Sequence, residues 1–264
     1  MMRFQIDKML EIAQLVSQLP IIEHVKDLFS AVEEVRPIPE SIEQRIMQKF
    51  RLDWNYNSNA IEGNQLTYGE TLSFLMYGLT AKGKPFKDHL DLKGHNEAIN
   101  YLLELVADGR GLTETDIRQL HRITLVEPYQ NTAMSPSGQL TKKTIQIGKY
   151  KTSPNHVITQ TGEIHYYATP EETPGLMNDL MDWLRRATYQ KDIHPVVIAA
   201  LFHHSFTIIH PFDDGNGRLA RILMNLILLN HRFLPVIIPK EERNIYFDTL
   251  AKGDSMILNL LSLI

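Results

Sequence analysis

The sequence predicts a mainly α-helical protein with a small β element in its middle. Apolar residues recur at helical spacing through most of the chain, and the exception is residues 129–170, where turn-forming residues and short β-favouring runs replace that pattern. The 264 residues are 43% hydrophobic and 22% charged, which is typical of a globular chain with a real core. Wholesale disorder is therefore excluded.

Residues 1–110 are predicted to form an N-terminal helical extension. A helix is expected from Ser41, with apolar residues at helical spacing up to Trp54, which we assign to the core. A longer helix is expected at about 88–107. No flexible linker marks the boundary with residues 111–264, which we treat as the second region.

Two of the helix starts carry capping signals. Thr67 and Glu70 form the Thr-x-x-Glu pattern of a capping box. Thr113 is expected to be the N-cap of the first helix of the second region.

The middle of the chain contains strand candidates at 144–150, 157–160 and 163–167. Thr161 and Gly162 between the last two are expected to form the turn of a hairpin.

Helical pattern returns at Pro174, a favourable first helical residue, and includes Trp183 as a further core residue. Another helix is expected from Pro195, a third over 216–230, and one or two more from Glu241 onward.

Composition excludes several function classes. Lys plus Arg is 27 and Asp plus Glu is 31, for a net charge of −4, which argues against a general nucleic-acid coat or a polybasic membrane binder. The chain has no Cys, so disulfides, thiolate metal sites and a cysteine nucleophile are excluded. There is no membrane span and the N-terminus does not resemble a signal peptide, so we expect a cytoplasmic protein.

The informative segment is His210–Arg221, HPFDDGNGRLAR, which lies between two apolar helical patterns. Its Gly215–Gly217 turn opens a helix, whose first N–H groups have no partner within the helix and form an anion site. Arg218 and Arg221 are three residues apart, so both are expected to point from one helix face toward the same anion.

Two further side chains add chemistry to this anion site. Asp214 offers a hard oxygen ligand suited to Mg²⁺. His210 has an ordinary pKa near 6.5, which neighbouring cations would lower, and a neutral imidazole is what a general base requires. Each feature alone is usually a capped turn or a solvated face, but their combination favours a site for a metal-bound polyphosphate.

The same segment resembles the Fic-domain signature HPFx(D/E)GNGRxxR at every defined position, and the similarity extends from about residue 90 to the end. The resemblance implies a Fic-like helical core with a β-hairpin flap, and transfer of AMP from ATP to a hydroxyl of a target protein. It implies His210 as base, Asp214 as Mg²⁺ ligand and Arg221 for the γ-phosphate. The α- and β-phosphates would be held by Gly215, Asn216, Gly217 and Arg218. Tyr246 is expected either to stack on adenine or to pack in the core.

An upstream segment, Ser58–Asn64, resembles the inhibitory motif (S/T)xxxE(G/N) of many Fic proteins, with Ser58, Glu62 and Gly63 at the defined positions. The resemblance implies that Glu62 pairs with Arg221. The γ-phosphate would then lose its anchor and the α-phosphate would be misaligned for attack.

Residues 148–158 resemble the lead into the family's flap, expected at about 144–168, with Lys151 where the family often has Arg. The exposed hairpin edge could pair with an extended segment of the target protein, or it could be a surface hairpin without a partner.

Several alternatives remain open. The chain could remove AMP with Glu62 aligning a water, act as a non-catalytic nucleotide sensor, or use UTP or a phosphocholine carrier as donor. His203 and His204 are expected to pack or to support the loop rather than bind zinc. Relatives with the inhibitory motif often dimerise, so a homodimer is compatible with the resemblance. No winged-helix domain follows, so nucleic-acid binding is not expected.

Overall fold

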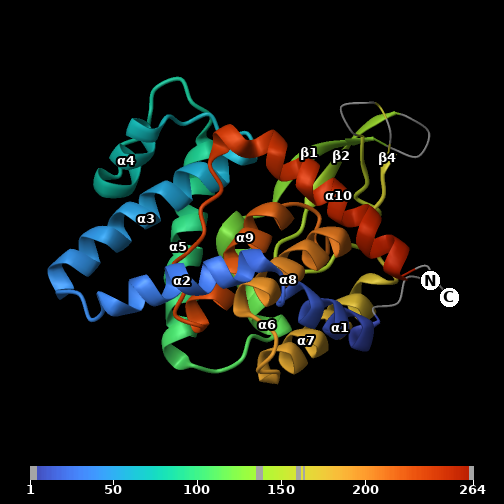
Figure 1. The fold of residues 1–264 in the computed structure, drawn as a ribbon. Helices are drawn as coiled ribbons and strands as arrows, with labels where there is room; N and C mark the ends of the chain where they lie inside the picture. Colours follow the sequence, from blue (N-terminus) through green and yellow to red (C-terminus); the bar gives the residue numbers. More distant parts are fainter. Residues whose placement is uncertain (1–4, 135–138, 159–161, 163, 262–264) are drawn as a thin grey trace.

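Helices form the bulk of the protein, as the sequence predicts. The computed structural model describes residues 5–134, 139–158, 162 and 164–261. The helical elements in chain order (Figure 1) are α1 (Ile6–Val16), α2 (Pro20–Glu34), α3 (Glu40–Ile61), α4 (Tyr68–Tyr77), α5 (Phe86–Asp108), α6 (Glu114–Leu125), α7 (Thr173–Tyr189), α8 (Pro195–Ile209), α9 (Asn216–Asn230), the 3₁₀ turn η1 (Lys240–Glu242) and α10 (Arg243–Leu261).

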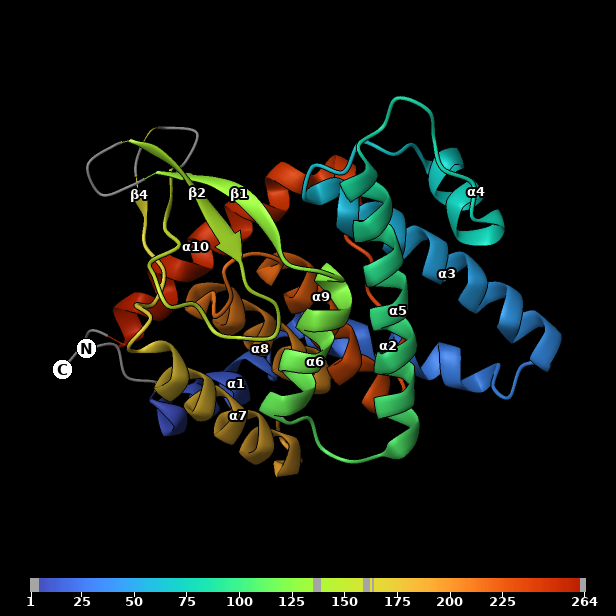
Figure 2. The same cartoon turned by 180° about the vertical axis from the view of Figure 1, so that it is seen from behind.

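The centre of the molecule is formed by α8 and α9, which pack side by side. Phe202 of α8 and Leu223 of α9 are completely buried, because both helices are apolar on most of their surface. Helices α5 and α6 cover them on one side (Figure 2), and α7 lies against α8. Trp54 and Trp183 are 4% and 0% exposed, which confirms both as core residues.

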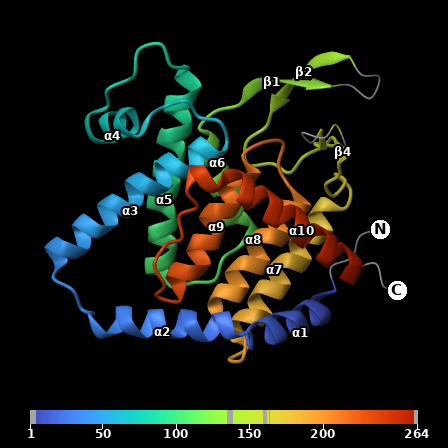
Figure 3. The same cartoon turned by 45° about the horizontal axis from the view of Figure 1, so that its top comes forward.

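Helices α1 and α2 follow one another along one edge of the molecule (Figure 3) and were not assigned from the sequence. Met9 and Leu10 of α1 belong to the same hydrophobic core as α7 and α8. The core therefore includes residues from both predicted regions, and the division at residue 110 remains a prediction.

Both capping predictions are confirmed. The Thr67 hydroxyl accepts from the Glu70 N–H at 3.3 Å, and the Glu70 carboxylate accepts from the Thr67 N–H at 2.8 Å. Thr113 and Asp116 form a second reciprocal box at the start of α6. These caps fix where α4 and α6 begin, and so fix the ends of the loops that precede them.

In the described part of the chain, the β element consists of two short antiparallel hairpins at one end of the molecule (Figure 1). Strand β1 (Tyr129–Met134) pairs with β2 (Leu140–Ile145), with Tyr129 opposite Ile145. Strand β3 (Val157–Ile158) pairs with β4 (Ile164–His165), with Val157 opposite His165. The β1–β2 hairpin was not predicted.

The predicted strand boundaries were partly wrong. The strand expected at 144–150 ends at Ile145, because Gly148 is left-handed with φ of 66° and donates its N–H to the His121 ring instead of a strand. Among the described residues of the second hairpin, 157–158 and 164–165 are strand, so Tyr166 and Tyr167 lie beyond β4. Residues 159, 160 and 163 of the predicted strands lie outside the described residues. Thr161 of the predicted turn lies outside the described residues.

Among the described residues, none of the helices combines the length and the apolar character that crossing a membrane requires.

Candidate functional site

The loop between α8 and α9 carries the predicted motif. Helix α8 ends at Ile209, and its C-cap His210 has a left-handed backbone with φ of 50°, while Gly215 with φ of 78° is the N-cap of α9. The Asn216 side chain accepts from the Phe212 N–H at 2.9 Å and donates to the Phe212 carbonyl at 2.8 Å. Both polar atoms of this amide are used to close the loop, and binding of phosphate by the backbone N–H groups of the helix start stays a prediction.

Arg221 is buried, at 3% exposed, and faces the end of α3. Its Nε donates to the Ser58 hydroxyl at 3.0 Å, and its Nη2 donates to the Ser58 carbonyl at 2.9 Å and to Glu62 Oε1 at 2.7 Å. The ion pair expected from the inhibitory motif is therefore present. Gly63 follows with φ of 94°, a conformation that lets the chain turn away directly after Glu62.

The Glu62 carboxylate lies on the first turn of α9. A Cβ placed on Gly217 would clash with Glu62 Oε1, so a larger residue at this position would displace the carboxylate from where it lies. A helix start is where the sequence predicts a phosphate, and an anionic side chain is favoured there for the same reason. Glu62 thus occupies the neighbourhood expected for the nucleotide phosphates.

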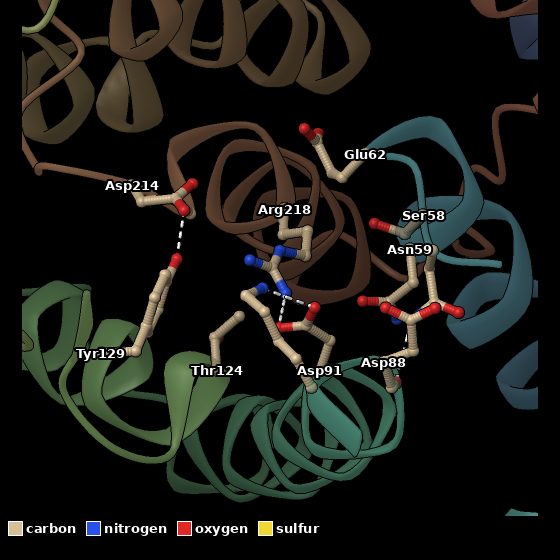
Figure 4. Close-up of polar contacts among 12 residues, drawn as sticks. Ser58, Asn59, Glu62, Asp88, Asp91, Thr124, Tyr129, Asp214 and Arg218 are labelled. Atoms are coloured by element: carbon tan, nitrogen blue, oxygen red, sulfur yellow. Dashed lines mark hydrogen bonds and ion pairs between the residues drawn. The ribbon is translucent and has the colours of Figure 1, made fainter. Parts of the chain in front are cut away.

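Arg218 is held by a different carboxylate. Its Nη1 lies 2.7 Å from Asp91 Oδ1, and Asp91 Oδ2 accepts from Lys87 Nζ at 2.8 Å. Figure 4 shows Arg218 directed from α9 toward Asp91 of α5, with Asp214 on one side and Glu62 on the other. Each arginine thus has a carboxylate partner on a different helix, and the convergence of both on one anion stays a prediction.

Asp214 is held in place by hydrogen bonds to both of its carboxylate oxygens. Oδ2 accepts from the Tyr129 hydroxyl of β1, and Oδ1 accepts from the Gly215 N–H at 2.6 Å. Burial alone would raise the pKa of Asp214, but the Tyr129 hydrogen bond and the Arg218 charge outweigh it and hold the pKa below its ordinary value. The carboxylate is therefore ionised at neutral pH.

This donor set fits Mg²⁺ bound together with a phosphate. Mg²⁺ in nucleotide sites takes one or two carboxylates and completes its shell with phosphate and water. Within the part of the chain that the structure describes, no three His, Cys, Asp or Glu side chains gather as a metal site, so Asp214 would act as a single protein ligand.

His210 is arranged as an acceptor of a proton. Its Nδ1 lies 3.2 Å from the Thr207 carbonyl, which can only accept, so Nδ1 carries the hydrogen and Nε2 is left with a lone pair. The ring stacks on Tyr167 with centroids 3.8 Å apart. Burial, followed by the Lys151 charge, lowers the pKa of His210 to about 3, so the imidazole is neutral at physiological pH.

One face of the His210 imidazole is covered by the Tyr167 ring. Tyr167, which stacks on His210, has its pKa raised to about 12 by burial first, and then by the negative charges of Asp254 and Glu62.

Tyr246 lies beside Arg221. Its ring centroid is 5.8 Å from the Arg221 guanidinium carbon, and its hydroxyl is 3.0 Å from His203 Nε2. His203 is 5% exposed, which agrees with a packing and supporting role. Contact of Tyr246 with adenine stays a prediction.

Three residues that support the site were missed from the sequence: Asp91, Tyr129 and His121. His121 is completely buried, with Nε2 at 2.9 Å from the Asp214 carbonyl and Nδ1 accepting from the Gly148 N–H at 2.8 Å. Tyr129 and His121 lie 85 and 93 residues from their partner Asp214 in the sequence, so no local pattern marks them.

Comparison with known proteins agrees with this geometry. Residues 111–228 match the family model described as Fic/DOC family. "Protein adenylyltransferase Fic" of Nematostella vectensis is 32% identical over 231 residues, covering 86% of this chain and 48% of that protein. The protein of the same name from Drosophila willistoni is 34% identical over 197 residues, covering 74% of this chain and 35% of that protein. The chain therefore spans about half or less of the length of these curated relatives.

Solved structures give the same assignment. A Fic domain containing signaling protein from Bacteroides thetaiotaomicron is 38% identical, with a TM-score of 0.79 over 88% of this chain and 81% of that one. Fic-1 from C. elegans is 26% identical, with a TM-score of 0.70 over 89% of this chain and 66% of that one. With the signature loop, the helical core and these relatives in agreement, the chain belongs to the Fic/DOC family.

Proposed function

We propose that this protein transfers AMP from Mg²⁺-ATP to a hydroxyl group of a target protein and is restrained by its own Glu62. The observation that carries the proposal is the Glu62 carboxylate, which lies on Gly217 at the start of α9 and pairs with Arg221 at 2.7 Å. An anion already occupies the place where the sequence predicts phosphate. The adenylyltransferase names of the curated relatives support the same activity.

The reaction needs few groups from the protein. The hydroxyl oxygen of the target attacks the α-phosphorus, the bond from that phosphorus to the bridging oxygen of the β-phosphate breaks, and pyrophosphate leaves. Nε2 of His210 takes the hydroxyl proton, since Nδ1 already carries a hydrogen. The backbone N–H groups at the start of α9 and the Arg218 guanidinium stabilise the charge on the transferred phosphoryl group. Asp214 would hold Mg²⁺, which neutralises phosphate charge when bound.

Restraint follows from competition for one guanidinium. While Arg221 pairs with Glu62, the γ-phosphate has no anchor there, and the α-phosphate is free to sit away from the line of attack. A misplacement of about 1 Å in such a site can cost on the order of 100-fold in rate. Removal of the carboxylate should therefore raise transfer.

The target partner belongs to the same proposal. An extended segment of a target protein would pair with the backbone edge of the β3–β4 hairpin, whose residue Val157 is 43% exposed. A homodimer and a cytoplasmic location complete the proposal.

The test uses ATP labelled at the α-phosphate and self-modification as the readout. The Glu62→Gly protein should incorporate label faster than the wild type, and the Glu62→Gly/His210→Ala protein should incorporate none. If the Glu62→Gly protein binds ATP but transfers no more label than the wild type, the restraint is wrong. If wild-type protein instead releases AMP from protein that was modified beforehand, the reaction runs mainly in the reverse direction.

A further inference from the structure

The segment that leads into the β3–β4 hairpin is bonded to the backbone of the catalytic loop. Lys151 contributes two of these bonds: its backbone N–H donates to the Pro211 carbonyl at 2.9 Å, and its Nζ donates to the Ile209 carbonyl at 3.1 Å. The Lys151 side chain is buried, with the residue only 3% exposed. Lysine is rarely buried to this degree, so these bonds indicate a specific role.

Asn155 contributes the other two bonds. Its Nδ2 donates to the His210 carbonyl at 3.1 Å and to the Phe212 carbonyl at 2.7 Å, and its Oδ1 accepts from Lys151 Nζ at 2.9 Å. Four consecutive carbonyls, from residue 209 to residue 212, therefore accept in alternation from Lys151 and Asn155. We call these two residues the loop clamp.

The loop clamp stabilises an unfavourable backbone conformation at His210. His210 has φ of 50°, the left-handed region that a residue with a Cβ adopts at a cost in free energy. Such a conformation persists only where the surroundings fix it by several contacts. The loop clamp bonds the carbonyl of His210 itself and those of its neighbours on both sides, so it fixes the direction in which the imidazole leaves the chain.

The same hairpin also fixes the ring. Tyr167, two residues beyond β4, stacks on the His210 imidazole at 3.8 Å with 16° between the planes. The Tyr167 N–H donates to His156 Nδ1 at 3.2 Å, which ties Tyr167 to the residue next to Asn155. Backbone and ring of His210 are thus both held by residues at the base of one hairpin.

We propose that Lys151, Asn155 and Tyr167 are positioning residues for His210, so that the β3–β4 hairpin aims the base as well as offering an edge to the target. The kinetic part of this inference rests on the proposed function. The burial that lowers the pKa of Lys151 to about 8 is compatible with it, because a buried ammonium is retained where it has carbonyl partners.

The first experiment is independent of activity. In protein labelled with ¹³C at histidine Cε1, the His210 signal is assigned by its loss in His210→Ala, and its pKa is measured by titration. Asn155→Ala should admit water and move the pKa of His210 upward toward 6.5, while Lys149→Met, which removes an exposed lysine two residues from Lys151, should leave it unchanged. An unchanged His210 pKa in Asn155→Ala would refute the clamp.

The second experiment uses the Glu62→Gly background and distinguishes the orientation of His210 from the binding of ATP. Asn155→Ala and Tyr167→Ala should lower kcat about 100-fold with KM for ATP changed less than about 2-fold. Tyr167→Phe keeps the stacked ring and Lys151→Arg keeps a cationic donor, so both should retain most of kcat. Circular dichroism confirms folding, and half-buried Tyr167 offers a variant that tests the idea if Asn155→Ala does not fold.

The outcomes distinguish the two proposals. If the Glu62→Gly parent transfers no AMP, the proposed function fails, while the titration of His210 still tests the clamp. If the parent is active and the clamp variants raise KM while kcat is unchanged, the residues serve binding and the positioning role is wrong.

Discussion

Helix α9 presents two buried arginines whose contacts look alike but whose partners differ. Arg218 and Arg221 each place a guanidinium nitrogen 2.7 Å from a carboxylate oxygen. Asp91, the partner of Arg218, lies within α5, has a side chain 13% exposed, and also binds Lys87. Glu62, the partner of Arg221, caps the end of α3 and has a side chain 35% exposed.

The comparison shows that an ion-pair distance does not define a role. A carboxylate held in a helix interior between two cations cannot move without leaving both unpaired, so Asp91 orients Arg218. A carboxylate at a helix end, partly open to water, can give way to a stronger anion such as a triphosphate. We therefore expect substitutions of the two acids to act in opposite directions on activity and to differ in their effect on stability.

The largest expected effect is the loss of stability in Asp91→Asn. Removing this charge deprives the buried Arg218 guanidinium and the Lys87 ammonium of the carboxylate that both bind. Breaking a buried pair of this kind costs about 3–5 kcal/mol. Glu62→Gln should cost less, about 1–3 kcal/mol, because the amide oxygen can still accept from Arg221 and Arg221 keeps both Ser58 contacts. Urea unfolding of the two variants and the wild type measures both values, and equal losses would show that the two pairs are equivalent.

Much of this helical framework is readable in the sequence. The capping boxes at Thr67 and Thr113 and the glycine start of α9 are local patterns with a local cause, and the structure has them at the expected residues. The Glu62–Arg221 contact joins distant residues, but both lie in motifs whose resemblance to a family is specific. The expected ion pair could therefore be named before any coordinates.

The missed features have no such signal. Asp91 looks like any acid on a helix surface, and only the packing of α5 against α9 turns it toward Arg218. The β1–β2 hairpin was missed because its strands pair through the backbone and Tyr129–Met134 shows no alternation of apolar and polar residues. Where a side chain points and which strands pair depend on tertiary structure, and hydrophobic periodicity in the sequence does not encode it.

The next prediction concerns how the free energy of unfolding depends on pH. It tests His203, whose pKa is affected by the charge of Arg221. Burial, followed by the charges of Arg221 and His204, lowers the pKa of His203 to about 3, against about 6.5 in the unfolded chain. Between these values the unfolded state binds the proton and the folded state does not, so stability is lost as pH falls below 6.5. The slope is about 1.4 kcal/mol per pH unit for this one group.

The measurement is urea unfolding at pH 7, 6 and 5. Between pH 6.5 and 5, His203→Asn should lose about 2 kcal/mol less of its free energy of unfolding than the wild type does, whatever the effect of the substitution at pH 7. Parallel curves for the variant and the wild type would mean that His203 takes up its proton in the folded state as readily as in the unfolded chain.

A smaller effect tests which phosphate Arg221 binds. In Glu62→Gly the guanidinium is free for the γ-phosphate, and one charge-assisted contact of this kind is worth about 1.5 kcal/mol, or roughly 10-fold in affinity. Calorimetry should therefore show ATP binding about 10-fold tighter than to wild type, with AMP affinity unchanged because AMP has no γ-phosphate. A similar gain for AMP would place the released charge nearer the α-phosphate.

The smallest effect concerns how firmly Glu62 is held. The segment after it is bonded to α5, since Asn64 Nδ2 donates to the Asp88 carbonyl at 2.8 Å and the Gln65 N–H donates to Asp88 Oδ2 at 2.8 Å. Asn64→Ala removes the bond to the Asp88 carbonyl, worth about 1 kcal/mol, together with the local bond that Asn64 Oδ1 accepts from the Leu66 N–H at 3.0 Å. Because the first of these bonds ties the segment to α5, its loss should let Glu62 leave Arg221 more often, and basal AMP transfer should rise roughly 5-fold.

The control for this variant is Asn178→Ala, the same change on an exposed position of α7. Label transfer from ATP by the otherwise wild-type protein measures both. A rise in Asn64→Ala that disappears when Glu62→Gly is added shows that the bond acts through Glu62, because without the carboxylate there is nothing left for it to hold. A rise that persists in the double variant would place Asn64 outside the restraint.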